Sequence, residues 1–266
     1  MNWASFEVVE QSLAGARIFH IDLAISPLGV SLVFSDSRNS RLEELQFEQV
    51  REFGIDLGRD DLVPTADISQ SSGRVLGTSY EPRGEGGIWR ISIDRISLSI
   101  TASHVITSEV RAPASDFEAH RTSLSGDALS SGDEMFVGMD PWAEGSTTTL
   151  QSKGRVVELG DEYRLSVIRI ELALGAVELF LDGAHGRSRL TFGEVSDVYL
   201  NPDRSRGGIP VISQDLDVDA GDLDRLDEIL VAPASEGGVA RRFFLVFAGS
   251  YLMVESQRVQ FVESGR

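Results

Sequence analysis

The chain repeats its own order of apolar segments, and this internal repeat limits its possible folds more than any other feature. The matching segments are Val8-Val9-Glu10 with Val156-Val157-Glu158, Ile21 to Ala24 with Ile170 to Ala173, Leu32 to Phe34 with Leu179 to Leu181, Phe47-x-x-Val50 with Phe192-x-x-Val195, Val63-Pro64 with Ile209-Pro210, and Trp89 to Val105 with Phe243 to Val259. The offset is 145 to 149 residues as far as the prolines and 154 after them, as one insertion in the second copy requires. Solenoid units are about 20 to 50 residues long, so a repeat of this length indicates a duplicated domain.

Within each copy, short apolar or alternating stretches are bounded by glycine and aspartate, a pattern typical of strands and hairpins. We expect strands at 17–24, 30–34 and within 42–53, and again at 165–174 and 177–181. Alternation along the first strand predicts one face made of Ile18, His20 and Asp22 and another made of Phe19, Ile21 and Leu23.

Each copy closes with its longest β-type segment, which can hold two strands joined by a tight turn at Asp94-Arg95 or at 248–250. The sequence therefore predicts a mainly β protein with two tandem copies of one β-sandwich or barrel-like domain. The copies occupy 1–111 and 153–266, and a Ser/Gly/Asp-rich linker occupies 112–152.

One helix is expected, from Asp222 to Leu230, as the insertion of the second copy. Leu223, Leu226, Ile229 and Leu230 recur at helical spacing behind an acidic first turn. The large apolar residues at the best-matched points of the repeat are expected to be buried at equivalent positions in two cores, one in each copy: Phe47, Val50, Trp89 and Ile91 in the first, and Phe192, Val195, Phe243 and Leu245 in the second.

The net charge of the 266-residue chain is −18, and it is spread evenly. Residues 1–111, 112–152 and 153–266 each carry an excess of six acidic residues. Such a surface disfavours nucleic acid and favours a basic protein partner; the alternative is that the acidity only aids solubility. Without cysteine there is neither a disulfide nor a thiolate metal site, and without a signal peptide or a long apolar run we expect a cytoplasmic protein with no membrane partner.

Partner-binding residues are expected in the acidic stretch peculiar to the second copy and at a tryptophan in the linker: Asp215, Asp217, Asp219, Asp222, Asp224, Asp227, Glu228 and Trp142. Trp142 has an alternative role, as an anchor that docks the linker on a domain. Asp217, Asp219 and Glu228 are also a calcium candidate, because alternate carboxylates can supply oxygen ligands. The EF-hand register that places Glu228 at position twelve puts Gly221 where a ligand belongs, so an acid-capped helix is the alternative.

Motifs for catalysis or cofactor binding are not found. The four histidines, His20, His104, His120 and His185, lack zinc-site spacing, and there is no Gly-x-Ser-x-Gly elbow or phosphate-binding loop. We therefore expect no cofactor and a function without catalysis.

The order of strand, turn, strand, Phe-x-x-Val, Ile-Pro and terminal β pair resembles small bacterial β-domains of immunity-type proteins that accompany toxins. Leu179 to Gly183, Leu190 to Val195, Ile209-Pro210 and Phe243 to Val259 carry the resemblance. It implies a binding protein that blocks a basic toxin or effector, with no catalytic residues. Two other hypotheses remain open: an assembly protein built from a pseudo-symmetric pair, and a carbohydrate-active or hydrolytic enzyme whose carboxylates meet only in space.

Overall fold

The structure is a computed structural model and is mainly β. It describes residues 4–25, 28–35, 42–57, 73–94, 96–110, 134–137, 145–147, 149–152, 155–172, 174–184, 186–201, 212–213, 225–233, 240–247 and 250–263. Neither described helix is long and apolar enough to cross a membrane.

The described residues of the first half form one helix and eight strands. They are α1 (Phe6–Leu13), β1 (Arg17–Ala24), β2 (Gly29–Ser35), β3 (Leu42–Glu48), β4 (Glu52–Leu57), β5 (Val75–Arg83), β6 (Gly86–Ile93), β7 (Ile96–Ala102) and β8 (His104–Glu109). Helix α1 buries Val9 and Leu13, one turn apart, and its Phe6 packs against the same core.

In the second half, the part of the chain that the structure describes forms eleven strands and a four-residue helix. They are β9 (Glu134–Val137), β10 (Gly145–Thr147), β11 (Thr149–Ser152), β12 (Arg155–Glu158), α3 (Leu159–Glu162), β13 (Tyr163–Glu171), β14 (Ala176–Gly183), β15 (Gly186–Asn201), β16 (Ile212–Ser213), β17 (Leu226–Pro233), β18 (Arg241–Phe247) and β19 (Ser250–Glu263).

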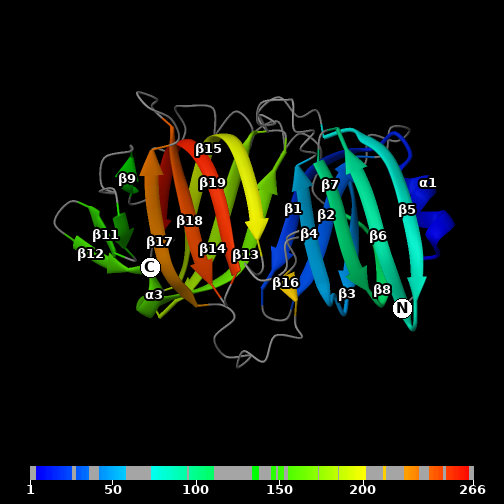
Figure 1. The fold of residues 1–266 in the computed structure, drawn as a ribbon, viewed down its shortest axis with the longest axis horizontal. Coiled ribbons are helices and arrows are strands. Elements are labelled where there is room, and N and C mark those ends of the chain that lie inside the picture. The colour runs from blue at the N-terminus through cyan, green and yellow to red at the C-terminus, as the bar shows by residue number, and fades with distance from the viewer. Residues whose placement is uncertain are drawn as a thin grey trace.

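One open sheet of twelve strands runs through both halves of the chain. Its order is β10-β17-β18-β19-β15-β14-β13-β1-β2-β3-β8, with β9 paired to β19. The halves meet where β1 pairs with β13, near the middle of Figure 1. A five-stranded sheet, β16-β4-β7-β6-β5, places β4 to β7 in front of β2, β3 and β8 in that view (Figure 1). The division into two domains and a linker, with boundaries at 111 and 153, stays a prediction. The main sheet contains strands from both predicted domains.

The two halves pair their strands in the same order. In the first, Phe47 of β3 lies between Val30 of β2 and Val105 of β8. In the second, Phe192 of β15 lies between Val177 of β14 and Val259 of β19. Each of these phenylalanines also contacts an aromatic ring of the facing strand: the ring centroids of Phe47 and Trp89 are 5.9 Å apart, and those of Phe192 and Phe243 are 5.1 Å apart.

The halves differ in how they bend at one matched point. Gln49 and Glu194 both have positive φ, 52° and 53°. In the first half the chain breaks there into β3 and β4, which belong to different sheets, whereas in the second half β15 continues through Glu194. The same backbone bend therefore separates two sheets in one half and curves a single strand in the other.

The predicted burial of the matched apolar residues is confirmed, but within one shared core in place of two. Phe47, Val50, Trp89, Ile91, Phe192, Val195, Phe243 and Leu245 are all buried and belong to one apolar cluster that spans both halves. The antiparallel pairing of β6 with β7 and of β18 with β19 agrees with the two predicted hairpins: Asp94 follows β6, and Ser250, which pairs with Phe247, begins β19. Arg95 and residues 248–249 lie outside the described part of the chain.

The predicted helix at Asp222 to Leu230 is wrong over Leu226 to Leu230, which lie in strand β17; residues 222–224 are outside the described part of the chain. The physical reason is a β-bulge between Leu226 and Glu228. A bulge adds one residue to a strand, so Leu226 and Ile229 are both buried although they are three residues apart. The three-residue spacing of Leu226 and Ile229 therefore results from a bulged strand and not from a helix.

Two other details of the sequence pattern are corrected by the structure. Val8-Val9-Glu10 lies in helix α1, whereas its match, 156–158, lies in strand β12, so this segment of the repeat has different local structure in each half. A bulge between Ile18 and His20 moves Ile18 to the core with Ile21 and Leu23, and leaves Phe19 half-buried.

The hairpins β1–β2 and β13–β14 also correct the alignment of the repeat. Each has five residue pairs between its four-residue turn and a bulge, at Phe19 in one and Ser166 in the other. This register makes Asp22 equivalent to Arg169, an offset of 147 residues, in place of the 149 that matching Ile21 to Ile170 gave. The two-residue difference preserves the face of the strand, which is why the apolar pattern did not reveal it.

Candidate functional site

The residues predicted for partner binding lie mostly outside the described chain. This holds for Asp215, Asp217, Asp219, Asp222, Asp224 and Trp142. Asp227 and Glu228 lie in β17, but their side chains are also outside the description. The calcium candidate therefore stays a prediction, and among the side chains that the structure does describe no group of three or more histidine, aspartate or glutamate residues could hold a metal ion.

The structure instead brings together a cluster of charged side chains at the seam between the halves, on the face of the main sheet away from the apolar core. Asp22 of β1 and Arg169 of β13 form its centre. Arg169 donates from Nε to Asp22 Oδ1 at 2.6 Å and from Nη2 to Asp22 Oδ2 at 2.7 Å. Both side chains are about one-quarter exposed or less (27% and 21%), so this two-pronged ion pair is only partly screened by water.

His20 and Glu171 lie beside this pair and face each other across the same two strands. His20 Nδ1 is 3.8 Å from Glu171 Oε1, and His20 Nε2 is 3.8 Å from Asp22 Oδ2. His20 and Glu171 are both buried, at 6% and 4% exposed. The imidazole therefore bridges two carboxylates in a site with little water.

Strands β14 and β15 extend the seam cluster into the second half. Glu178, directly opposite Arg169 on β14, is 1% exposed, and its Oε1 is 3.1 Å from Arg189 Nη1. This contact is an ion pair without hydrogen-bond geometry, and within the described chain neither oxygen of Glu178 accepts a hydrogen bond. The guanidinium of Arg169 also lies over the Phe180 ring, 5.1 Å from its centroid.

The charges of the seam cluster balance only with one additional proton. It contains three carboxyl groups, two guanidinium groups and one imidazole. Burial, with the negative charges of Glu178 and Asp22, raises the pKa of Glu171 to about 8, although Arg169 and Arg189 oppose the shift. Glu171 therefore holds that proton at neutral pH.

The sequence pattern predicted only part of the seam cluster. It placed His20 and Asp22 on one strand face, but Asp22 and Arg169 are 147 residues apart in the chain. Their contact depends on the pairing of β1 with β13, which the apolar pattern does not specify. The available signal was the presence of charged residues in otherwise apolar strands, since buried charges are seldom left without partners.

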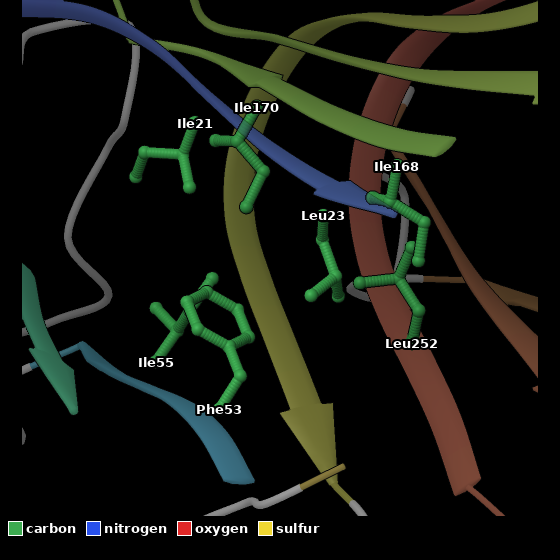
Figure 2. A pocket seen from close by; sticks show the side chains of 7 residues that line it. All are labelled: Ile21, Leu23, Phe53, Ile55, Ile168, Ile170 and Leu252. Atoms are coloured by element: carbon green, nitrogen blue, oxygen red, sulfur yellow. The ribbon is translucent and has the colours of Figure 1, made fainter. Parts of the chain in front are cut away.

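The opposite face of the same seam is apolar and encloses a small cavity of about 10 Å³. Figure 2 shows its lining, which is Ile21, Leu23, Phe53, Ile55, Ile168, Ile170 and Leu252. These side chains come from β1, β4, β13 and β19. A space of this size barely admits one water molecule and offers it no polar partner, so it is a dry packing defect and not a ligand site.

A second polar feature is the outer face of β3, where Glu44, Gln46 and Glu48 alternate with buried Leu45 and Phe47. Both glutamates are half-buried, and Glu44 accepts a hydrogen bond from Ser108 of the neighbouring strand β8 at 3.4 Å.

The second half carries the opposite charge at the position that matches Glu44. Val30, paired with Phe47, matches Val177, paired with Phe192, so Glu44 corresponds to Arg189. Asp22 is likewise opposite in charge to its own counterpart, Arg169. At these two matched positions the outer face is acidic in the first half and basic in the second.

Comparison with known proteins gives no relative: no protein-family model, no curated protein and no solved structure matches this chain.

Proposed function

We propose that the protein binds another macromolecule, preferably a basic protein, and that it does so without catalysis. The proposal is supported by the net charge of −18 and by the outer face of the first half, where acidic residues occupy positions that are arginine in the second half. The acidic face of β3 carries the proposal, because Glu44 and Glu48 lie on the same face of one strand and both are partly exposed.

The proposed partner class follows from this charge. A negative field raises the rate of encounter with a positive protein and repels the phosphate backbone of nucleic acids. An immunity-type protein that blocks a basic toxin or effector is the form of this function suggested by the resemblance of the strand pattern. We also propose that the chain arose by duplication of one β-sandwich unit, since both halves share strand order, hairpin register and matched aromatic contacts.

A charge-matched comparison tests the binding face. The full-length protein is used to capture its partner from the native host, and association rates are then measured with that purified partner. Glu44→Gln with Glu48→Gln should lower the association rate about threefold or more at low salt. The control, Glu81→Gln with Glu85→Gln, changes the net charge equally on the β5–β6 hairpin of the other sheet. Equal rates for the two double variants would reject the β3 face as the binding surface.

A hydrolytic enzyme is the alternative that the seam cluster brings forward, because the cluster contains three carboxyl groups and the pKa of one of them, Glu171, is raised. Glu171 and Glu178 are 4% and 1% exposed, however, so a substrate would have to displace neighbouring side chains to reach them. The apolar cavity lies on the opposite face of the sheet and contains neither residue. Binding is therefore the better supported function.

A further inference from the structure

The seam between β1 and β13 has a local two-fold symmetry. Strand β1 pairs antiparallel with β13 so that Asp22 lies directly opposite Arg169, its own counterpart in the hairpin register. The flanking hydrogen bonds obey the same symmetry: Ile25 N–H donates to the Ser166 carbonyl at 3.1 Å, and the matching Leu172 N–H donates to the Phe19 carbonyl at 2.9 Å. The halves therefore meet as two copies of one unit would meet in a symmetric dimer.

Charge breaks this symmetry at its centre. If two first halves met in this register, Asp22 would face Asp22, and if two second halves met, Arg169 would face Arg169. Like charges directly opposite each other in a sheet are destabilising. Only the pairing of a first half with a second half forms the two-pronged ion pair.

The other contacts at the seam discriminate less between a like half and an unlike half. The opposite face is lined by isoleucine, leucine and phenylalanine, with Phe53 of the first half and Leu252 of the second near the same cavity (Figure 2). Apolar contacts are non-directional, so such a face would accept a like half or an unlike half. The selectivity of the seam therefore lies on its charged face.

We propose that the β1–β13 seam is a self-recognition surface whose partner is the opposite half of this chain, within one molecule or in a second copy, and that Asp22 and Arg169 determine this choice. The proposal rests on the duplication proposed above for the origin of the two halves, but the strand register is observed directly. It does not depend on the basic partner, because its tests measure the stability and the dimer formation of this chain alone.

The first test uses charge reversal in the full-length chain. Asp22→Arg and Arg169→Asp each place like charges at the centre of the seam, and each should lower the thermal midpoint by about 5 to 15 °C. The double variant restores opposite charges and should recover most of this loss. The matched control is Asp182→Arg with Arg187→Asp, an exposed pair with a 2.9 Å contact inside the second half, whose reversal should change the midpoint little.

The second test asks for recognition between molecules. The two single variants are unfolded together and refolded as a mixture. If two chains exchange halves, one seam combines both substitutions and the other contains the original Asp22 and Arg169, so both seams have opposite charges. The 23 residues between Val110 and Glu134 can span at most about 75 Å, which sets the reach available for exchange.

We expect light scattering to detect a dimer in the mixture and less of it in either variant refolded alone. The two single control variants, mixed in the same way, should form no more dimer than each forms when refolded alone. An exchange of halves cannot bring their two substitutions together, because both positions lie in the second half. A mixture with no more dimer than the separate variants, or a double variant no more stable than the single ones, would overturn the proposal. If a single variant fails to refold alone, the thermal midpoint of the double variant and the amount of dimer in the mixture still test the proposal.

Discussion

At the scale of single residues, Glu171 makes the stability of the fold depend on pH. Its carboxyl group is buried beside Glu178 and Asp22, which raises its pKa to about 8, whereas an unfolded chain would ionise it near the ordinary value of 4.5. The folded chain therefore keeps a proton that the unfolded chain has lost. This contribution to stability is fully present below about pH 4.5 and is lost as the pH rises towards 8.

We predict that Glu171→Gln removes this dependence, since the amide resembles the protonated carboxyl group. The unfolding free energy of the unchanged protein, measured in urea from pH 5 to 8.5, should fall by at most about 1.4 kcal/mol for each pH unit from this group. The variant should show a flatter profile and be the more stable protein at pH 8. Glu81→Gln serves as the control, because the Arg90 and Arg83 side chains lower the pKa of that exposed group, so its titration lies below this pH range and its replacement should leave the slope of the profile unchanged. Parallel profiles for the Glu171 variant and the unchanged chain would contradict the prediction.

The residue scale also separates what the sequence could reveal from what it could not. Burial of Phe192 and Phe243 followed from their matched places in the repeat and is confirmed. The position of Ile18 was predicted wrongly, because a bulge at Phe19 reverses the alternation of faces. Apolar periodicity predicts a face well only where the strand is regular.

At the scale of elements, substitutions at the Glu194 bend test whether the backbone is strained at this matched point of the repeat. Glu194 has φ of 53°, a region that residues with a Cβ atom seldom occupy, and its side chain makes only an exposed contact of 3.5 Å with Arg258. Glu194→Gly should raise the unfolding free energy by about 0.5 to 1 kcal/mol, and Glu194→Val should lower it by about 1 to 2 kcal/mol.

Chemical denaturation measures both effects. Gln260→Gly in β19 is the control, because it introduces the same flexibility within a regular strand and should be destabilising. If Glu194→Gly were as destabilising as this control, the bend would not be strained.

Strands were predicted more successfully than helices for a physical reason. β1 begins and ends where alternation and the glycine turn indicated, at Arg17 and Ala24. The missed helix α1 is only eight residues long, and the false helix was a bulged strand, β17. Spacing of three between apolar residues is shared by helices and bulged strands, so it cannot distinguish them without the neighbouring strand.

At the scale of the whole molecule, the main sheet contains strands from both halves of the chain, and each half pairs its matched strands in the same order. The repeat predicted that the two halves share an order of segments along the chain, but it did not predict the β1–β13 pairing that joins them, because apolar faces do not specify a partner strand. The charged seam cluster therefore became visible only in the folded chain. Two matched positions on the polar face carry opposite charges, Asp22 with Arg169 and Glu44 with Arg189.

The acidic excess is also a property of the whole molecule, and its densest stretch, Asp215 to Glu228, lies in the second half. We predict that changing Asp217, Asp219, Asp222 and Asp224 together to asparagine lowers the association rate with a captured basic partner, because a weaker negative field attracts it less. The difference between this variant and the unchanged protein should shrink between low and physiological salt, where the screening length is about 8 Å. Stopped-flow measurement of association at several salt concentrations tests both statements. A rate that is unchanged by the substitutions, or that does not respond to salt, would show that charge does not guide the encounter even if the two proteins bind.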